Sequence, residues 1–152
     1  MGNKRMIINW ILLIAWMLLI FLMSNQPAHI SNQQSNSFIN MLAFFGIDLN
    51  SKLGSLASFV VRKTAHFTEY AVLGFFTYKA VSCDVLDRKK AVLIAQLIST
   101  GYASTDEIHQ MFVPGREGKV FDVMIDSCGA FCGIMLSLIS QKLIEKKKGN
   151  QI

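Results

Sequence analysis

Acidic and imidazole side chains occur in pairs inside three apolar stretches of this chain. The members of each pair are three or four residues apart, so they would share one face of a helix. An imidazole beside a carboxylate can transfer a proton, and ionisable groups in apolar helices usually face a bundle interior or a water-filled cavity. The pairs, which we take as candidate catalytic residues, are His66 with Glu69, Asp106 with His109, and Asp122 with Asp126.

Cationic and hydrogen-bonding side chains flank these pairs and are candidate binding residues. Arg116 lies in the segment VPGREGK, where Pro114 and Gly115 predict a turn. The planar fork of arginine suits a phosphate or a carboxylate. The candidate binding residues are Arg62, Lys63, Tyr70, Glu107, Gln110 and Arg116.

The helices that would carry these groups are predicted to span a membrane. The chain has 152 residues, of which 52% are hydrophobic and only 16% charged, so it fits a single membrane domain over 1–152. Its apolar runs predict spans at about 6–23, 63–82, 91–111 and 120–143, each close to the roughly 20 residues that one crossing needs. Short links between them predict an all-α bundle of four transmembrane helices.

The first apolar run, Met6 to Met23, contains no charged residue and follows the basic start GNKR. Such a start also occurs in signal peptides. However, the run is long for a signal peptide, and the following SNQPAH offers no clean small-x-small cleavage site. An uncleaved first span is therefore the favoured interpretation.

The net charge of +5 is explained by the positive-inside rule and does not require nucleic acid as a partner. With four spans, nine basic residues fall on the side of the two termini and five on the other, which predicts that both termini are cytoplasmic. The nine are Lys4, Arg5, Arg88, Lys89, Lys90, Lys142, Lys146, Lys147 and Lys148, and the five are Lys52, Arg62, Lys63, Arg116 and Lys119.

A long first extracytoplasmic loop is predicted over 24–62. Pro27 and the polar segment SNQPAHISNQQSNS discourage continuation of the first helix, and the later FINMLAFFGI is too short to span. That apolar segment could lie in the membrane interface or pack as a lid on the bundle. The second spanning helix could begin as early as Leu53. Cys83, Cys128 and Cys132 match neither a zinc site nor a disulfide framework and are expected to be buried packing residues.

This topology brings all the polar pairs to the outer part of the membrane. Asp126 would lie about 9 Å below the start of its helix, comparable to the depth of Glu69. Carboxylates bonded across helices can serve merely to hold a bundle together. Convergence of these six groups and Glu107, seven ionisable groups in all, at one depth on three helices favours a functional site instead.

Three sequence blocks, RKTAHFTEYAVLGFF, TDEIHQMFVPGREG and FDVMIDSCGAFCG, resemble the VanZ-like membrane protein family in order and spacing. The exit from the first span, SNQP, and the Ser-rich stretch after it are also similar to that family. Asp126 departs from the more usual Asn of the family pattern. The resemblance implies a cell-envelope role and, for the founding member, resistance to the glycopeptide antibiotic teicoplanin.

Three functions follow as hypotheses. The site could bind or act on an anionic, lipid-linked envelope component, such as a cell-wall precursor or a phospholipid, or the protein could be a non-catalytic accessory that alters antibiotic or precursor access. An intramembrane metal site is a third alternative, since bundles bring His and Glu ligands inward. The expected partner is the lipid bilayer, and no cofactor and no nucleic acid are expected. The residues do not decide between an enzyme and a binding protein, nor do they predict an oligomeric state.

Overall fold

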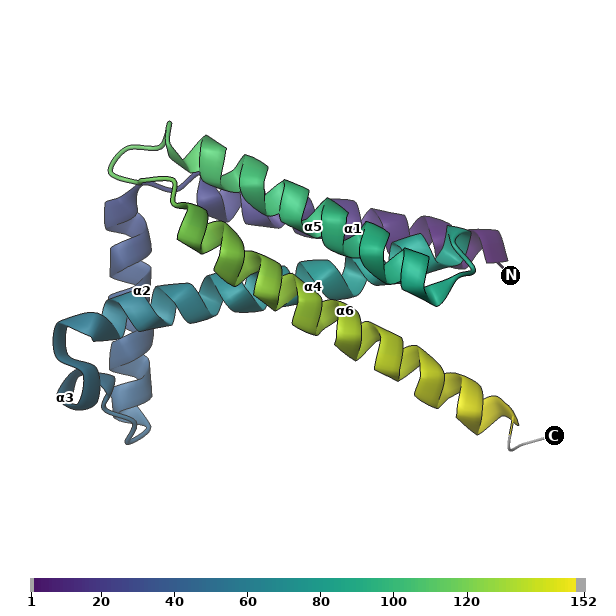
Figure 1. Cartoon of the computed structure of the whole chain (residues 1–152). Helices are drawn as coiled ribbons and strands as arrows, with labels where there is room; N and C mark the ends of the chain where they lie inside the picture. The colour runs from purple at the N-terminus through teal and green to yellow at the C-terminus, as the bar shows by residue number, and fades with distance from the viewer. Residues whose placement is uncertain (1, 150–152) are drawn as a thin grey trace.

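Every regular element of the computed structural model is helical within residues 2–149, the part of the chain that it describes (Figure 1). A 3-10 turn, Gly54–Leu56, joins two of the helices. The helices are α1 (Gly2–Ser24), α2 (Ala28–Phe44), α3 (Leu49–Leu53), α4 (Ala57–Asp84), α5 (Arg88–Gln110) and α6 (Val120–Gly149).

Helix α4 is the centre of the fold, because α1, α2, α5 and α6 all pack against it. Figure 1 shows α1 and α5 running opposite to α4, whereas α6 runs in the same direction and crosses it. The start of α1, the α4–α5 link and the end of α6 therefore lie at one end of the molecule. The α1–α2 corner and the α5–α6 loop lie at the other end, and α2 extends crosswise there (Figure 1).

Glycines allow α4 and α6 to cross with their backbones in close approach. A Cβ atom at Gly133 would collide with the backbone carbonyl of Ala71, and one at Gly129 with that of Phe67. On α4, a Cβ at Gly74 would meet the backbone of Ala130 in the same way. Small residues four apart permit such crossings in membrane helices. This crossing sets the register in which the polar side chains of α4 and α6 face each other.

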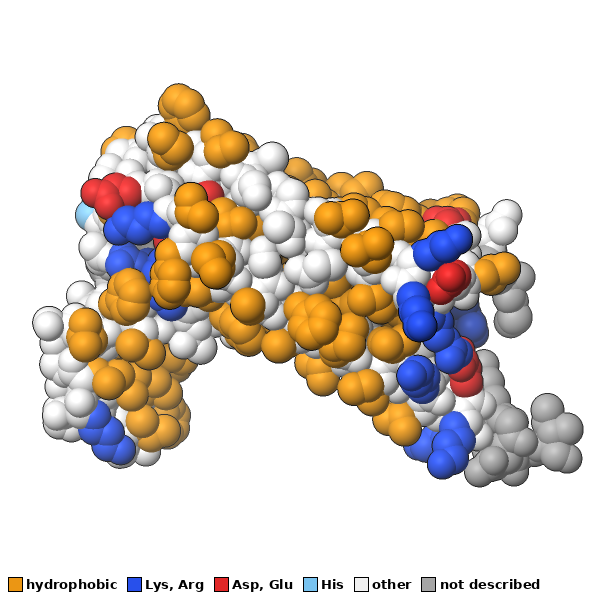
Figure 2. Space-filling model, in the orientation of Figure 1, with side chains coloured by type: hydrophobic (Ala, Val, Ile, Leu, Met, Phe, Trp, Pro, Cys, Tyr) orange, Lys and Arg blue, Asp and Glu red, His pale blue; other side chains and the backbone are white. Residues whose placement is uncertain are grey.

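Two helices are long and apolar enough to cross a membrane: Asn3–Ser24 within α1 and Val120–Lys147 within α6. Many of their large apolar side chains are exposed, including Ile11, Leu18 and Leu136. A water-soluble protein rarely leaves such a continuous apolar surface uncovered. Figure 2 shows this surface as a band between two groups of charged side chains. The composition and the exposure together indicate a membrane protein.

Helix α1 is an integral part of the packed core. Leu13 and Ile20 are buried in a cluster that includes Tyr70 and Leu73 of α4. The hydroxyl of Tyr102 also donates to the backbone carbonyl of Met17, at 2.6 Å. The first apolar run therefore contributes directly to the packing of α4 and α5.

Residues 28–44, which lie inside the segment predicted as a long loop, form the helix α2. Pro27 does end the first helix, but it then serves as the N-cap residue of the next one. The backbone N–H of Ala28 donates to the carbonyl of Pro114. Ser35 and Ile39 are buried, and α2 packs on α4. Tertiary packing thus overrides the weak helix propensity of the Asn- and Ser-rich segment.

The apolar end of α2 combines features of both predicted arrangements, a lid on the bundle and a segment in the membrane interface. Phe38 and Leu42 line a pocket beside α4, as a lid would. Phe44 and Phe45 are exposed, as residues in contact with lipid would be. The helix ends before Gly46, whose φ of +86° suits glycine.

The expectation that the cysteines are buried is wrong, because Cys83, Cys128 and Cys132 are all exposed and free. The buried face of α6 carries small and polar residues such as Gly129 and Gly133 instead. Cys128 and Cys132 are four apart and lie together on an exposed side of the helix, next to that face.

Candidate functional site

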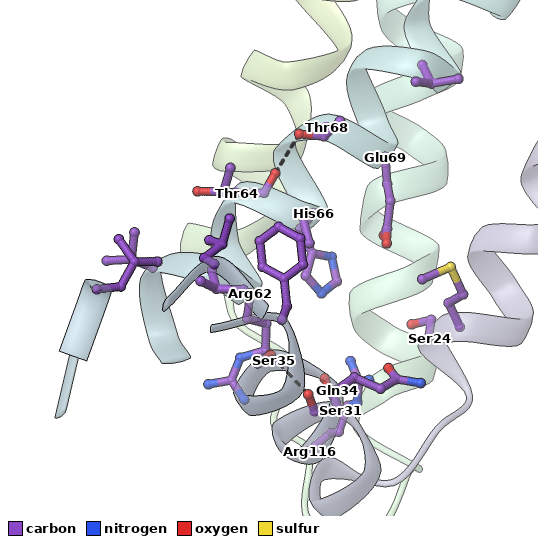
Figure 3. A pocket seen from close by; sticks show the side chains of 18 of the residues that line it. Ser24, Ser31, Gln34, Ser35, Arg62, Thr64, His66, Thr68, Glu69 and Arg116 are labelled. Carbon is purple, nitrogen blue, oxygen red and sulfur yellow. Dashed lines mark hydrogen bonds between the residues drawn. The ribbon is translucent and has the colours of Figure 1, made fainter. Parts of the chain in front are cut away.

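A pocket of about 630 Å³ lies between α1, α2 and α4 at the end where the α5–α6 loop arrives. Four of the candidate residues line it: Arg62, His66, Glu69 and Arg116. Figure 3 shows the side chains of His66, Glu69 and Arg116 directed into a common space. Much of the remaining wall is apolar and includes Met23, Val60 and Val72, so the pocket is amphipathic.

Arg116 joins the α5–α6 loop to two other parts of the chain. Its Nε donates to the carbonyl of Gln26 at 2.9 Å, and an Nη donates to Oε1 of Gln110 at 3.3 Å. The Gln110 amide in turn donates to Oδ2 of Asp106 at 3.2 Å. Burial lowers the pKa of Arg116, and Asp106 opposes that shift. A guanidinium nevertheless remains protonated in proteins. Gln110 thus orients a permanently charged group at the pocket.

Arg62 and Lys63 are adjacent in sequence but have different partners. Lys63 Nζ lies 2.5 Å from Oδ2 of Asp122, so its charge is neutralised across the α4–α6 interface. Arg62 donates to the side-chain oxygen of Asn32, a neutral group, at 2.7 Å. In the described part of the chain, neither Arg62 nor Arg116 forms an ion pair with a carboxylate.

His66 connects the pocket to the carboxylates behind it. Its Nδ1 lies 4.0 Å from Oδ1 of Asp126, which is fully buried on α6. Asp126 is not among the residues that line the pocket, nor is Asp106. The site therefore has one layer at the pocket and a second layer of acidic groups on α5 and α6.

Three candidate residues do not line the pocket and make packing or hydrogen-bond contacts elsewhere in the bundle. Glu107 accepts the backbone N–H of Lys119 at 2.8 Å, immediately before α6 begins. The ring of His109 packs on Phe21 of α1, with ring centroids 4.8 Å apart. Tyr70 is buried in the core that α1 and α4 share. Asp106 and His109 thus have different neighbours, because Asp106 accepts from the Gln110 amide whereas His109 packs on α1.

Sequence reasoning missed the residues that α1 and α2 contribute. Ser24, Ser31 and Gln34 line the pocket, and the Trp16 indole donates to the carbonyl of Glu69 at 2.9 Å. The segment SNQPAHISNQQ follows an apolar helix directly, at the depth of the predicted site. That position was a signal that its polar groups would join the site.

Metal coordination receives no support from the geometry. Among residues 2–149, no three His, Cys, Asp or Glu side chains come together as a set that could hold a metal ion. The arrangement instead offers two cations for an anionic group, and an imidazole beside them that can exchange a proton.

The pattern of the VanZ/LLP1 family matches residues 9–141, which include most of α1 and α6, the whole of α2, α4 and α5, and every residue of the site. The chain belongs to the VanZ/LLP1 family. The match to this VanZ-like family agrees with the resemblance of its three sequence blocks. No curated protein and no solved structure shows significant similarity to the chain.

Glu107 is expected to hold the start of α6 in this VanZ-like protein. Glu107→Ala removes the acceptor of the Lys119 N–H and should lower stability by about 1–2 kcal/mol. The matched control is Glu117→Ala in the same loop, because Glu117 is exposed and bonds only to the exposed side chain of Lys119. Thermal unfolding in detergent would measure both variants. Equal melting temperatures for the two would contradict the assigned role of Glu107.

Proposed function

We propose that this protein is a multi-pass protein of the bacterial cell membrane whose site binds the anionic head group of a lipid-linked envelope component. Both termini would be cytoplasmic and the site would lie at the outer face. The grouping of the basic α4–α5 link with the C-terminal end of α6 supports this orientation (Figure 2). The crosswise α2 would then lie along the outer surface of the membrane (Figure 1).

The observation that carries the proposal is the pair of arginines without carboxylate partners. Arg62 and Arg116 both line the pocket, and both bond only to neutral acceptors in residues 2–149. An arginine that is partly withdrawn from water gains most from an anionic partner with which it can form two parallel hydrogen bonds. A phosphate fits this requirement and would lie between α4 and the α5–α6 loop.

The apolar wall supports a lipid rather than a small soluble anion. Phe38, Leu42 and Leu49 lie on the α2–α3 side of the pocket, and Val60 and Val61 on α4. A soluble phosphate would leave this surface without a partner, whereas an acyl chain would cover it and gain about 25 cal/mol for each Å² of apolar surface buried. The pocket therefore has a polar part for the phosphate head group and an apolar part for the acyl chain of a lipid.

Family membership supports an association with antibiotic resistance through the cell envelope. A protein that binds a lipid-linked envelope component could change the amount or accessibility of the target that a glycopeptide antibiotic such as teicoplanin recognises. We propose that any such effect depends on the arginines of the pocket.

Binding of phosphatidic acid with a fluorescent acyl chain to the purified protein in detergent micelles tests the proposal. Arg62→Gln and Arg116→Gln should each weaken binding about tenfold or more, because each removes a charge-assisted hydrogen bond. Arg88→Gln is the control, since this exposed arginine lies at the opposite end and pairs with Glu145. A fluorescent diacylglycerol without phosphate should bind weakly to all of them.

Two further measurements complete this test. Weak competition by inorganic phosphate is expected if the acyl chain contributes to binding, whereas strong competition would indicate a soluble anion as the ligand. Teicoplanin susceptibility of cells producing the same variants gives the cellular readout. Unchanged lipid binding in Arg62→Gln and Arg116→Gln would overturn the proposal and favour the accessory alternative.

A further inference from the structure

The layer of acidic groups behind the pocket contains Asp126, a carboxylate that has no part in the proposed binding of a ligand by the two arginines. Both side-chain oxygens of Asp126 are buried and have no hydrogen-bond partner among the described residues. The Nδ1 atom of His66 is also buried and without such a partner, and it lies 4.0 Å from Oδ1 of Asp126. A carboxylate buried without a partner is costly, so this proximity calls for an explanation.

The two sides of the His66 imidazole have different surroundings. On one side the imidazole borders the pocket, which Arg62 and Glu69 of the same helix also line (Figure 3). On the other side its Nδ1 faces α6 and Asp126. The two imidazole nitrogens point away from each other, so a side chain with Nδ1 at α6 can present Nε2 to the pocket.

We propose that Asp126 is a positioning residue that holds the proton of neutral His66 on Nδ1 and leaves Nε2 free to accept a proton from a ligand in the pocket. This inference rests on the proposed function for the presence of a ligand there. It adds an acid–base role, in which the carboxylate on α6 acts only through the histidine on α4.

The proton transfer is balanced within the site. A hydroxyl group or a water at the pocket loses its proton, and a new N–H bond forms at Nε2 of His66. The resulting imidazolium is stabilised by the carboxylate of Asp126 on its other side. Donor–acceptor distances in unliganded sites are often long and shorten when a ligand binds, so 4.0 Å is compatible with this role.

Other charged groups also lie near His66, so a control must change some of them while Asp126 stays in place. Lys63 and Glu69 belong to the same helix, Asp106 to α5, Arg116 to the loop and Asp122 to α6. The Lys63–Asp122 pair provides the control, because Asp122 is on the same helix as Asp126, one turn away, and its charge can be removed together with that of Lys63. The double variant Lys63→Met/Asp122→Leu removes both charges of this pair, leaves no unpaired charge and keeps the group that faces Nδ1.

Nitrogen-15 NMR of histidine-labelled protein in micelles measures the tautomer directly, at a pH well above the usual range of imidazole titration. The chain has three histidines, and His29→Gln and His109→Gln would identify the other two signals. In the wild type we expect His66 to be a single Nδ1–H tautomer. Asp126→Asn should abolish that single-tautomer signature, whereas Lys63→Met/Asp122→Leu should preserve it.

The wild-type spectrum alone can overturn the inference, even if Asp126→Asn fails to fold. An Nε2–H tautomer or an equal mixture of tautomers at His66 would do so, as would an unchanged signature in folded Asp126→Asn. The experiment needs no lipid, so its failure is distinguishable from failure of the proposed function. Loss of phosphatidic acid binding in the arginine variants, with the expected tautomer present, would leave both proposals standing.

Discussion

Gly133→Ala is expected to destabilise the protein by about 3 kcal/mol, although it adds a single methyl group. The added Cβ would collide with the backbone carbonyl of Ala71, and a backbone cannot move aside as a flexible side chain can. The helices α4 and α6 would have to separate along their whole contact. By the usual scaling for chains of this size, the melting temperature should fall by roughly 6–12 °C.

Gly101→Ala is the matched control for this prediction. Gly101 lies in the middle of α5, is exposed, and has no atom within 4 Å of the position that a Cβ would occupy. The same substitution there should leave stability unchanged or raise it by up to about 1 kcal/mol, because alanine favours the helix. Similar melting temperatures for Gly133→Ala and Gly101→Ala would show that the α4–α6 crossing is not as close as the structure has it.

Asp122→Ala is expected to have the second large effect, a loss of about 3–5 kcal/mol. The side chains of Lys63 and Asp122 are only 18% and 14% exposed, so removal of the carboxylate leaves a poorly hydrated ammonium group without a partner. The ring of Phe59, 5.5 Å from Lys63 Nζ, offers only partial compensation. Thermal unfolding of the purified protein measures the loss.

An exposed ion pair of the same length provides the control. Arg88 and Glu145 are also 2.5 Å apart, but their side chains are 50% and 60% exposed. Water and salt screen such a pair, so Glu145→Ala should cost at most about 1 kcal/mol. The double variant Lys63→Met/Asp122→Leu should recover most of the stability, because it leaves no unpaired charge. If Asp122→Ala were no more destabilising than Glu145→Ala, burial of the Lys63–Asp122 pair would be refuted.

The sequence alone determined which segments form long helices and which residue types they carry. Apolar runs located α1 and α6 closely, and the spacing of His66 and Glu69 predicted that they share the face of α4 from which both line the pocket. These features are local, because helical periodicity and side-chain chemistry depend on neighbours a few residues away. The sequence did not indicate that the polar segment after Pro27 joins the helix α2, because that helix depends on packing against α4.

Only the tertiary structure decided which groups face each other. Asp106 and His109 have the same spacing as His66 and Glu69, yet His109 packs on Phe21 of α1. The rotation of each helix about its axis is fixed by contacts with distant segments, above all by Gly129 and Gly133 of α6. A helix turned by one residue rotates its side chains by about 100°, so local spacing cannot assign a partner on another helix. The pairing of His66 with Asp126, and the pocket in front of it, follow from that crossing.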